Sequence, residues 1–170
     1  GDHGELLGEH GYYAHAHTVY EPVLNIPFLM LRYGYESKAH ISGDVVASQI
    51  DIAPTILAEL DIPSPKSWAG LPLQANAKAL RERRFIYFQQ QAEYGLFDLS
   101  QPGHLWKYRI NSDDRSEWAH EVSNKRDETD NRLHEIPAAL KTEWIKRLLE
   151  LQMSAHEYAS DPLKTDQALH

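Results

Sequence analysis

The sequence has no cysteine among its 170 residues, which excludes disulfide bonds, thiolate metal sites and a cysteine nucleophile within these residues. It also has no excess of basic residues, because 17 lysines and arginines stand against 25 acidic residues and the formal net charge is -8. A nucleic-acid partner requires a basic face, so we expect none. The acidic balance still permits a small anionic substrate, since a bound metal ion can outweigh nearby carboxylates.

Long apolar runs are missing as well. No run approaches the roughly 20 apolar residues of a membrane-spanning helix, and the start shows neither the basic nor the apolar region of a signal peptide. We expect no membrane segment in this chain, and its localisation stays open. The sequence begins with Gly1 instead of Met and enters a dense polar stretch at once, so we expect it to be a piece of a longer chain.

Apolar residues make up 42% of the sequence, which is normal for a folded domain with a core. In the first half, residues 1–22 are polar and rich in glycine and histidine, and we expect a loop with one short helical turn. The apolar run 24–31 predicts a buried strand, and 32–43 a polar loop. Apolar residues at helical spacing predict a helix over 48–60, with Pro54 in its first turn, and the proline-rich stretch 62–73 predicts a loop.

The second half changes character. Aromatic and β-branched residues separated by turn signals predict four short strands, at 84–91, 94–100, 105–111 and 117–123. Adjacent short strands favour an antiparallel sheet. Apolar residues then recur every three or four positions and predict an amphipathic helix with Pro137 near its start; they are Ile136, Leu140, Trp144, Leu148 and Leu151. We expect the tail after Ser154 to be loosely ordered. A single buried strand cannot form a sheet, so the strand expected at 24–31 needs neighbouring strands that are not among the elements predicted for this chain.

The chemistry concentrates in the opening, GDHGELLGEHG. Asp2 and His3 are adjacent, and Gly1 and Gly4 free the backbone so that both side chains can turn toward one point. A carboxylate and a neutral imidazole both bind divalent cations, although calcium takes six to eight ligands and zinc about four, so the rest must come from elsewhere. His15 and His17 could bind an anion or protonate a leaving group. Three more polar residues crowd the segment: Glu5, Glu9 and His10.

Residue types alone leave this open. An adjacent Asp and His also form an ordinary capped turn, and a surface histidine pair is often merely solvated. Other candidates have plainer explanations: loop lysines that solvent covers, tryptophans that pack in a core, and acids or hydroxyls at a helix start. These are Lys38 and Lys66, Trp68 and Trp106, and Asp51 and Thr55.

The order of the residues is more specific than their types. GDHGELLGEHG followed by YYAHAHTVYEPVLNIPFLM resembles the segment around the second metal-ligand pair of the sulfatases, in the alkaline phosphatase superfamily. The match ends with Tyr20, Glu21 and Pro27, and Tyr20 and Glu21 would orient the loop over the site. Residues 48–73, the LWKYRIN stretch (105–111) and RDETDNRL (126–133) are also similar to later parts of that family. The resemblance covers about 1–150, and its first block is the specific one.

The resemblance implies roles for four residues. Asp2 and His3 match the metal pair, for which calcium is the usual ion and zinc or manganese the alternatives because of the imidazole. His15 matches a position where many sulfatases have lysine and phosphoethanolamine transferases have histidine. It would bind the sulfate or phosphate oxygens or assist the leaving group, and His17 is a second candidate for this role.

The resemblance also implies a fold: the C-terminal part of an alkaline-phosphatase-like α/β sandwich, plus a small antiparallel sheet packed with a C-terminal helix. Residues 1–76 would end the catalytic domain, 77–154 would form the C-terminal subdomain, and 155–170 a tail. The family's nucleophile, a formylglycine or a threonine, lies upstream and has no counterpart here. The missing N-terminal half would therefore be a partner, and this chain alone would be inactive.

The expected activity of the complete enzyme is hydrolysis of small anionic sulfate esters. Phosphoethanolamine or phosphoglycerol transfer and phosphonate monoester hydrolysis, with phosphate-type substrates, are alternatives within the superfamily. A non-catalytic metal-binding module is an alternative of another class. The sequence leaves the identity of the substrate open.

Overall fold

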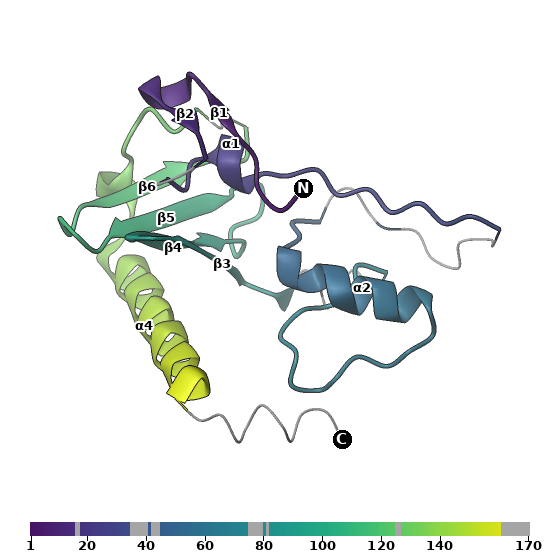
Figure 1. Ribbon diagram of the computed structural model, residues 1–170. Coiled ribbons are helices and arrows are strands. Elements are labelled where there is room, and N and C mark those ends of the chain that lie inside the picture. The colour runs from purple at the N-terminus through teal and green to yellow at the C-terminus, as the bar shows by residue number, and fades with distance from the viewer. Residues whose placement is uncertain are drawn as a thin grey trace. The chain divides into compact units, whose positions relative to one another are not determined.

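The computed structural model (Figure 1) describes residues 1–15, 18–34, 41, 45–74, 80, 82–124 and 127–160, with side chains described to residue 153 in the last range. Contacts divide the chain into two compact units. Unit 1 combines Gly1–Phe28 with Arg84–Ser160, and unit 2 comprises Leu29–Arg83. This division groups the first 28 residues with the later sheet, whereas the sequence led us to place a boundary near residue 76.

Unit 1 is built on a four-stranded antiparallel sheet in the order β3-β4-β5-β6. Each strand pairs with the next along the chain, as expected for short strands joined by tight turns. The bounds are β3 Phe85–Gln90, β4 Glu93–Asp98, β5 Trp106–Asn111 and β6 Glu117–Glu121. The four predicted strands and their antiparallel pairing are confirmed, within a few residues at each end.

One face of the sheet packs against helix α4 (Ala138–Ser160). Register places Leu96, Tyr108 and Ala119 side by side on this face, and all three are fully buried against Trp144 and Leu148 of the helix. The predicted amphipathic helix is thereby confirmed. It extends further than expected, however, because residues 155–160 continue the helix instead of forming a loose tail. The remainder of the predicted tail lies outside the described residues.

The opposite face of the sheet carries Lys107 and Arg109 of β5, with His120 of β6 opposite Lys107. These polar side chains are buried as well, because residues from the start of the chain cover them. Figure 1 shows β1 (Leu6–Leu7), β2 (Tyr13–Ala14) and α1 (Glu21–Leu24) on this side and α4 on the other. The sheet of unit 1 is therefore covered on both faces.

The predicted buried strand at 24–31 is wrong. Glu21–Leu24 form a short helix with a proline in its first turn, and residues 25–33 have no regular secondary structure. Phe28, Leu29 and Leu31 are exposed. An apolar run becomes a strand only where a neighbouring edge offers backbone partners, and none of the described residues pairs with it. The predicted loop at 1–22 also contains a hairpin that the sequence did not indicate.

Unit 2 contains the predicted helix, α2 (Ile52–Glu59), preceded by a 3-10 turn at Gln49–Asp51. Its buried residues are Pro54 and Thr55, whereas Ile56 and Leu60 of the expected apolar face are exposed. Asp51 is fully buried and accepts hydrogen bonds from the backbone N–H groups of Ser48 and Leu71 (2.8 and 2.9 Å). Arg83 pairs with the same carboxylate at 2.7–2.8 Å, so Asp51 has a structural role at the helix start.

Candidate metal centre

The hairpin formed by β1 and β2 brings Glu5 and His15 together. Leu6 pairs with Ala14 and Leu7 with Tyr13, and continuing this antiparallel register places Glu5 opposite His15. The turn between the strands uses left-handed backbone at Gly8 and Gly11 (φ 128° and 77°), where glycine lacks the steric penalty of other residues. His15 Nδ1 and Glu5 Oε2 lie 3.0 Å apart. The glycines of the opening stretch thus serve a turn that aligns two chemically active side chains.

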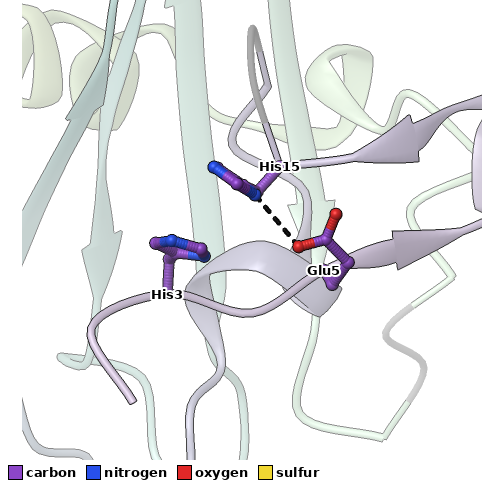
Figure 2. Close-up of side chains that lie close together, drawn as sticks. All are labelled: His3, Glu5 and His15. Atoms are coloured by element: carbon purple, nitrogen blue, oxygen red, sulfur yellow. Dashed lines mark hydrogen bonds and ion pairs between the residues drawn. The ribbon is translucent and has the colours of Figure 1, made fainter.

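His3 completes a group of three donors. Its ring stacks on that of His15, with centroids 3.8 Å apart and an interplanar angle of 26°. One donor atom each from His3, Glu5 and His15 lies within 4.8 Å of the others, and Figure 2 shows the three side chains gathered at the open end of the hairpin. Among the described residues, this is the group whose histidine and carboxylate atoms are close enough to share one metal ion.

Asp2, the other predicted ligand, is exposed and is not a member of this group. A hydrogen bond from its own backbone, together with the adjacent His3, holds the pKa of Asp2 below its usual range. It is therefore a carboxylate at neutral pH, as a metal ligand must be. His17 lies outside the described residues, so its predicted role stays a prediction.

The donor set bears on the choice of ion. Two imidazoles and one carboxylate suit zinc or manganese, whereas calcium takes six to eight oxygen ligands. The residues brought together thus fit a transition metal better than the calcium that the sequence resemblance implies. From the sequence, Glu5 was only one of several polar residues in a crowded segment. The pairing of β1 with β2 around the turn at Gly8 is what identifies it as a candidate ligand, because this register places it opposite His15.

Gly4 fixes this end of the hairpin to α1. Its N–H donates to Val23 O at 2.8 Å, and a Cβ atom placed on Gly4 would lie 1.9 Å from Pro22 O. Any side chain would therefore push the backbone of residues 3–5 away from α1. The close approach positions His3 and Glu5 on either side of a residue that cannot be enlarged.

We expect Gly4→Ala to lower the free energy of unfolding of unit 1 by about 1–3 kcal/mol, since the clash is with backbone that cannot step aside. Urea denaturation followed by tryptophan fluorescence measures this. Gly11→Asn is the control, because no atom lies within 4 Å of a Cβ there. Asparagine adopts positive φ at a smaller penalty than most residues, so this variant should lose less stability than Gly4→Ala. Equal stability of the two variants would show that the approach of Gly4 to Pro22 is unimportant.

Side chains of the sheet hold the segment that follows His15. Lys107 donates to Val19 O and pairs with Glu21 at 3.3 Å and Glu128 at 2.8 Å. Glu128 in turn accepts the backbone N–H of Glu21 at 2.6 Å. All of these side chains are buried. The cluster joins three distant parts of the sequence and ties the base of the hairpin to the sheet.

Tyr20 lies between the hairpin and Arg109. Its ring stacks on His10 with centroids 3.7 Å apart, and the Arg109 guanidinium lies 4.5 Å from its centroid. Arg109 also pairs with Glu93 at 3.1 Å, which accepts the N–H of Val19 at 3.2 Å. Tyr20 and Glu21 therefore anchor the loop through the sheet, by contacts across 70 to 110 residues that no local sequence pattern reveals.

The remaining sequence candidates lie in different parts of the chain. Trp106 packs at the edge of the core of unit 1, Lys66 and Trp68 are exposed in unit 2, and Lys38 lies outside the described residues. No helix in the described part of the chain combines the length and the apolar character needed to cross a membrane.

Part of the chain is similar to known sulfatases. Arylsulfatase K of Rattus norvegicus is 36% identical over 81 residues, 46% of this chain and 14% of that protein. Arylsulfatase K of Homo sapiens is 36% identical over 72 residues, 42% of this chain and 13% of that protein. Arylsulfatase K of Bos taurus is 31% identical over 86 residues, 49% of this chain and 15% of that protein.

The matched regions thus span about one-seventh of the length of these curated relatives and less than half of this chain. No family model matches the chain, and no solved structure matches it. The comparisons support a relationship with the sulfatases at the level of the family, and the mixed α/β architecture is compatible with the fold expected from the sequence.

Proposed function

We propose that this chain is the C-terminal portion of a sulfatase, whose nucleophile is supplied by a part of the protein upstream of Gly1. The similarity to three arylsulfatases over 72 to 86 residues carries the proposal. The hairpin supports it, because it collects anion- and metal-binding side chains at one exposed place. In this proposal the chain contributes one wall of the site and the small sheet that supports it.

The residues have distinct tasks in this arrangement. Asp2 and His3 would hold a divalent ion, which supplies positive charge to the oxygens of the sulfate ester. His15 or His17 would donate a hydrogen bond to a sulfate oxygen or to the leaving group. Glu5 holds the His15 ring through its bond to Nδ1, and Gly4 fixes the backbone between His3 and Glu5. Lys107 and Arg109 act only by anchoring this segment.

The activity of the complete protein tests the proposal. We expect the full product of the gene to hydrolyse an aryl sulfate such as 4-methylumbelliferyl sulfate, and the 170-residue chain alone to be inactive. Asp2→Asn should lower kcat/KM of the complete protein by about 100-fold or more, since the loss of a metal ligand exceeds the 10- to 100-fold effect of changing the groups around one. Asp113→Asn, at an exposed turn, is the matched control and should leave kcat/KM unchanged.

Two outcomes would redirect the assignment. Turnover of the corresponding phosphate or phosphonate ester without turnover of the sulfate would assign the protein to the phosphoryl-transferring branch of the superfamily. Metal binding without turnover of any ester would favour the non-catalytic metal-binding module, to which this chain would contribute the donors of His3, Glu5 and His15.

A further inference from the structure

We propose that His3, Glu5 and His15 are the three protein ligands of a zinc site, with a fourth coordination position open to solvent. This assigns His15 to the metal instead of the anion, and it adds Glu5, which no sequence pattern marked as a ligand. The inference rests on the geometry of the hairpin and not on which ester the complete protein hydrolyses. In a sulfatase it would leave His17 as the candidate for the anion.

The spacing of the donors is close to what zinc requires. With Zn–N distances near 2.0–2.1 Å, two donors of a tetrahedral site lie roughly 3.4 Å apart. His15 Nδ1 and Glu5 Oε2 are 3.0 Å apart. If these two atoms move slightly apart, a zinc ion can take the place of the proton that they share. One donor atom from each of the three residues lies within 4.8 Å of the others, so no pair needs to close by more than about 1.4 Å to reach the tetrahedral spacing.

The backbone and the histidine tautomer support this arrangement. His3 Nδ1 lies 2.9 Å from Gly4 O, and a donor at Nδ1 leaves the lone pair on Nε2 for a metal. Histidine ligands in proteins are oriented by this kind of bond to a backbone carbonyl. The stacked rings must turn out of their near-parallel arrangement to point at one ion. The side chains of Glu5 and His15 are 46% and 44% exposed, so each has a solvent-facing side toward which it can turn.

Ion selectivity follows from the donors. Imidazole nitrogen suits zinc far better than calcium or magnesium, which prefer oxygen. Three protein ligands with an open position are typical of zinc sites that bind water or a substrate, whereas structural zinc sites use four. An oxyanion is the class of ligand that such an open position, beside an exposed hairpin, would take.

Zinc titration of the purified 170-residue chain by isothermal calorimetry tests the site, with cobalt absorption as a report of tetrahedral coordination. We expect one zinc per chain, and a loss of affinity of about 10-fold to 100-fold or more in His3→Ala, Glu5→Gln and His15→Ala. His104→Ala is the matched control, because His104 also lies beside a glutamate (Glu121, 3.8 Å) and is exposed. Circular dichroism confirms that each variant folds.

Each alternative has its own result. Zinc binding that survives in Glu5→Gln and His15→Ala but fails in Asp2→Asn would overturn the inference in favour of the Asp2 and His3 pair. Calcium binding of equal or greater affinity would overturn the choice of ion. Binding that no single substitution weakens would show only dispersed histidine binding. Absence of ester turnover by the complete protein would remove the proposed function and leave these titrations unaffected.

Discussion

Lys107→Met is expected to lower the free energy of unfolding of unit 1 by about 3–5 kcal/mol, the usual penalty for removing one partner of a buried ion pair. Lys107 is fully buried and lies between the carboxylates of Glu21 and Glu128. Methionine has a similar length and no charge, so it fills the space and leaves the carboxylates without their cation. Val19 O also loses its donor.

The surrounding charges make the loss severe. In the folded protein, Lys107 and Arg109 are grouped with three buried carboxylates, those of Glu21, Glu93 and Glu128. Burial lowers the pKa of His120, next to them, and so opposes its protonation in place of the missing charge. Without Lys107, one cation would face three carboxylates in a site closed to water, where unpaired charge is most costly.

Guanidinium denaturation followed by tryptophan fluorescence measures the effect, since Trp106, Trp118 and Trp144 all lie in unit 1. Lys146→Met is the matched control. Lys146 makes the same kind of pair, with Glu150 at 3.9 Å, but its side chain is 74% exposed, and exposed pairs contribute about 1 kcal/mol or less. Glu128→Gln added to Lys107→Met should recover part of the loss. Similar stability of Lys107→Met and Lys146→Met would contradict the anchoring role.

The sheet and its helix were predictable because their residues follow local rules. Leu96, Tyr108 and Ala119 sit in short strands rich in aromatic and β-branched residues, and Trp144 and Leu148 recur at helical spacing. Their side chains find one another across a meander with short turns, so each step depends on neighbours in sequence. The four strands were accordingly expected within a few residues of their observed bounds.

The features that could not be predicted depend on contacts between residues far apart in the sequence. Lys107 reads as an ordinary polar residue of a strand, and its burial depends on Glu21, 86 positions earlier. The predicted strand at 24–31 is wrong for the converse reason. Its apolar pattern is that of a strand, but no strand among the described residues pairs with it. Of the three residues that the structure brings together, His3 and His15 were named from their order in the sequence, whereas Glu5 required the register of a hairpin whose strands have two residues each.

Trp144→Ala is expected to destabilise unit 1 by about 3–5 kcal/mol, the range for truncating a buried aromatic side chain. Trp144 is fully buried, and its ring lies 5.3 Å from that of Tyr108. Leu149→Ala is the control on the same helix, since Leu149 is more than half exposed, and it should cost about 0.5 kcal/mol or less. Urea denaturation at pH 7 compares the two. A loss in Trp144→Ala no larger than in Leu149→Ala would show that the helix does not hold the sheet.

Trp144→Phe separates the packing of the ring from its hydrogen bond. The indole Nε1–H donates to Asp98 Oδ2 at 2.7 Å, and Asp98 is fully buried. Burial alone would raise the pKa of Asp98, but hydrogen bonds from Trp144, Ser100 and Arg84 outweigh it and hold the pKa below the ordinary value of 3.8. Phenylalanine retains most of the apolar volume and removes one donor, so we expect a loss of about 1–3 kcal/mol at pH 7.

The pH dependence identifies the source of that loss. Because the pKa of Asp98 is lower in the folded state than in the unfolded chain, its ionisation stabilises the fold fully above about pH 4, and this contribution disappears as the pH falls through the folded pKa. Trp144→Phe raises the folded pKa and makes the contribution smaller. The stability difference between wild type and Trp144→Phe should therefore narrow below about pH 4 in urea denaturation series. A difference that stays constant from pH 7 to pH 3 would assign the whole effect to packing against Tyr108.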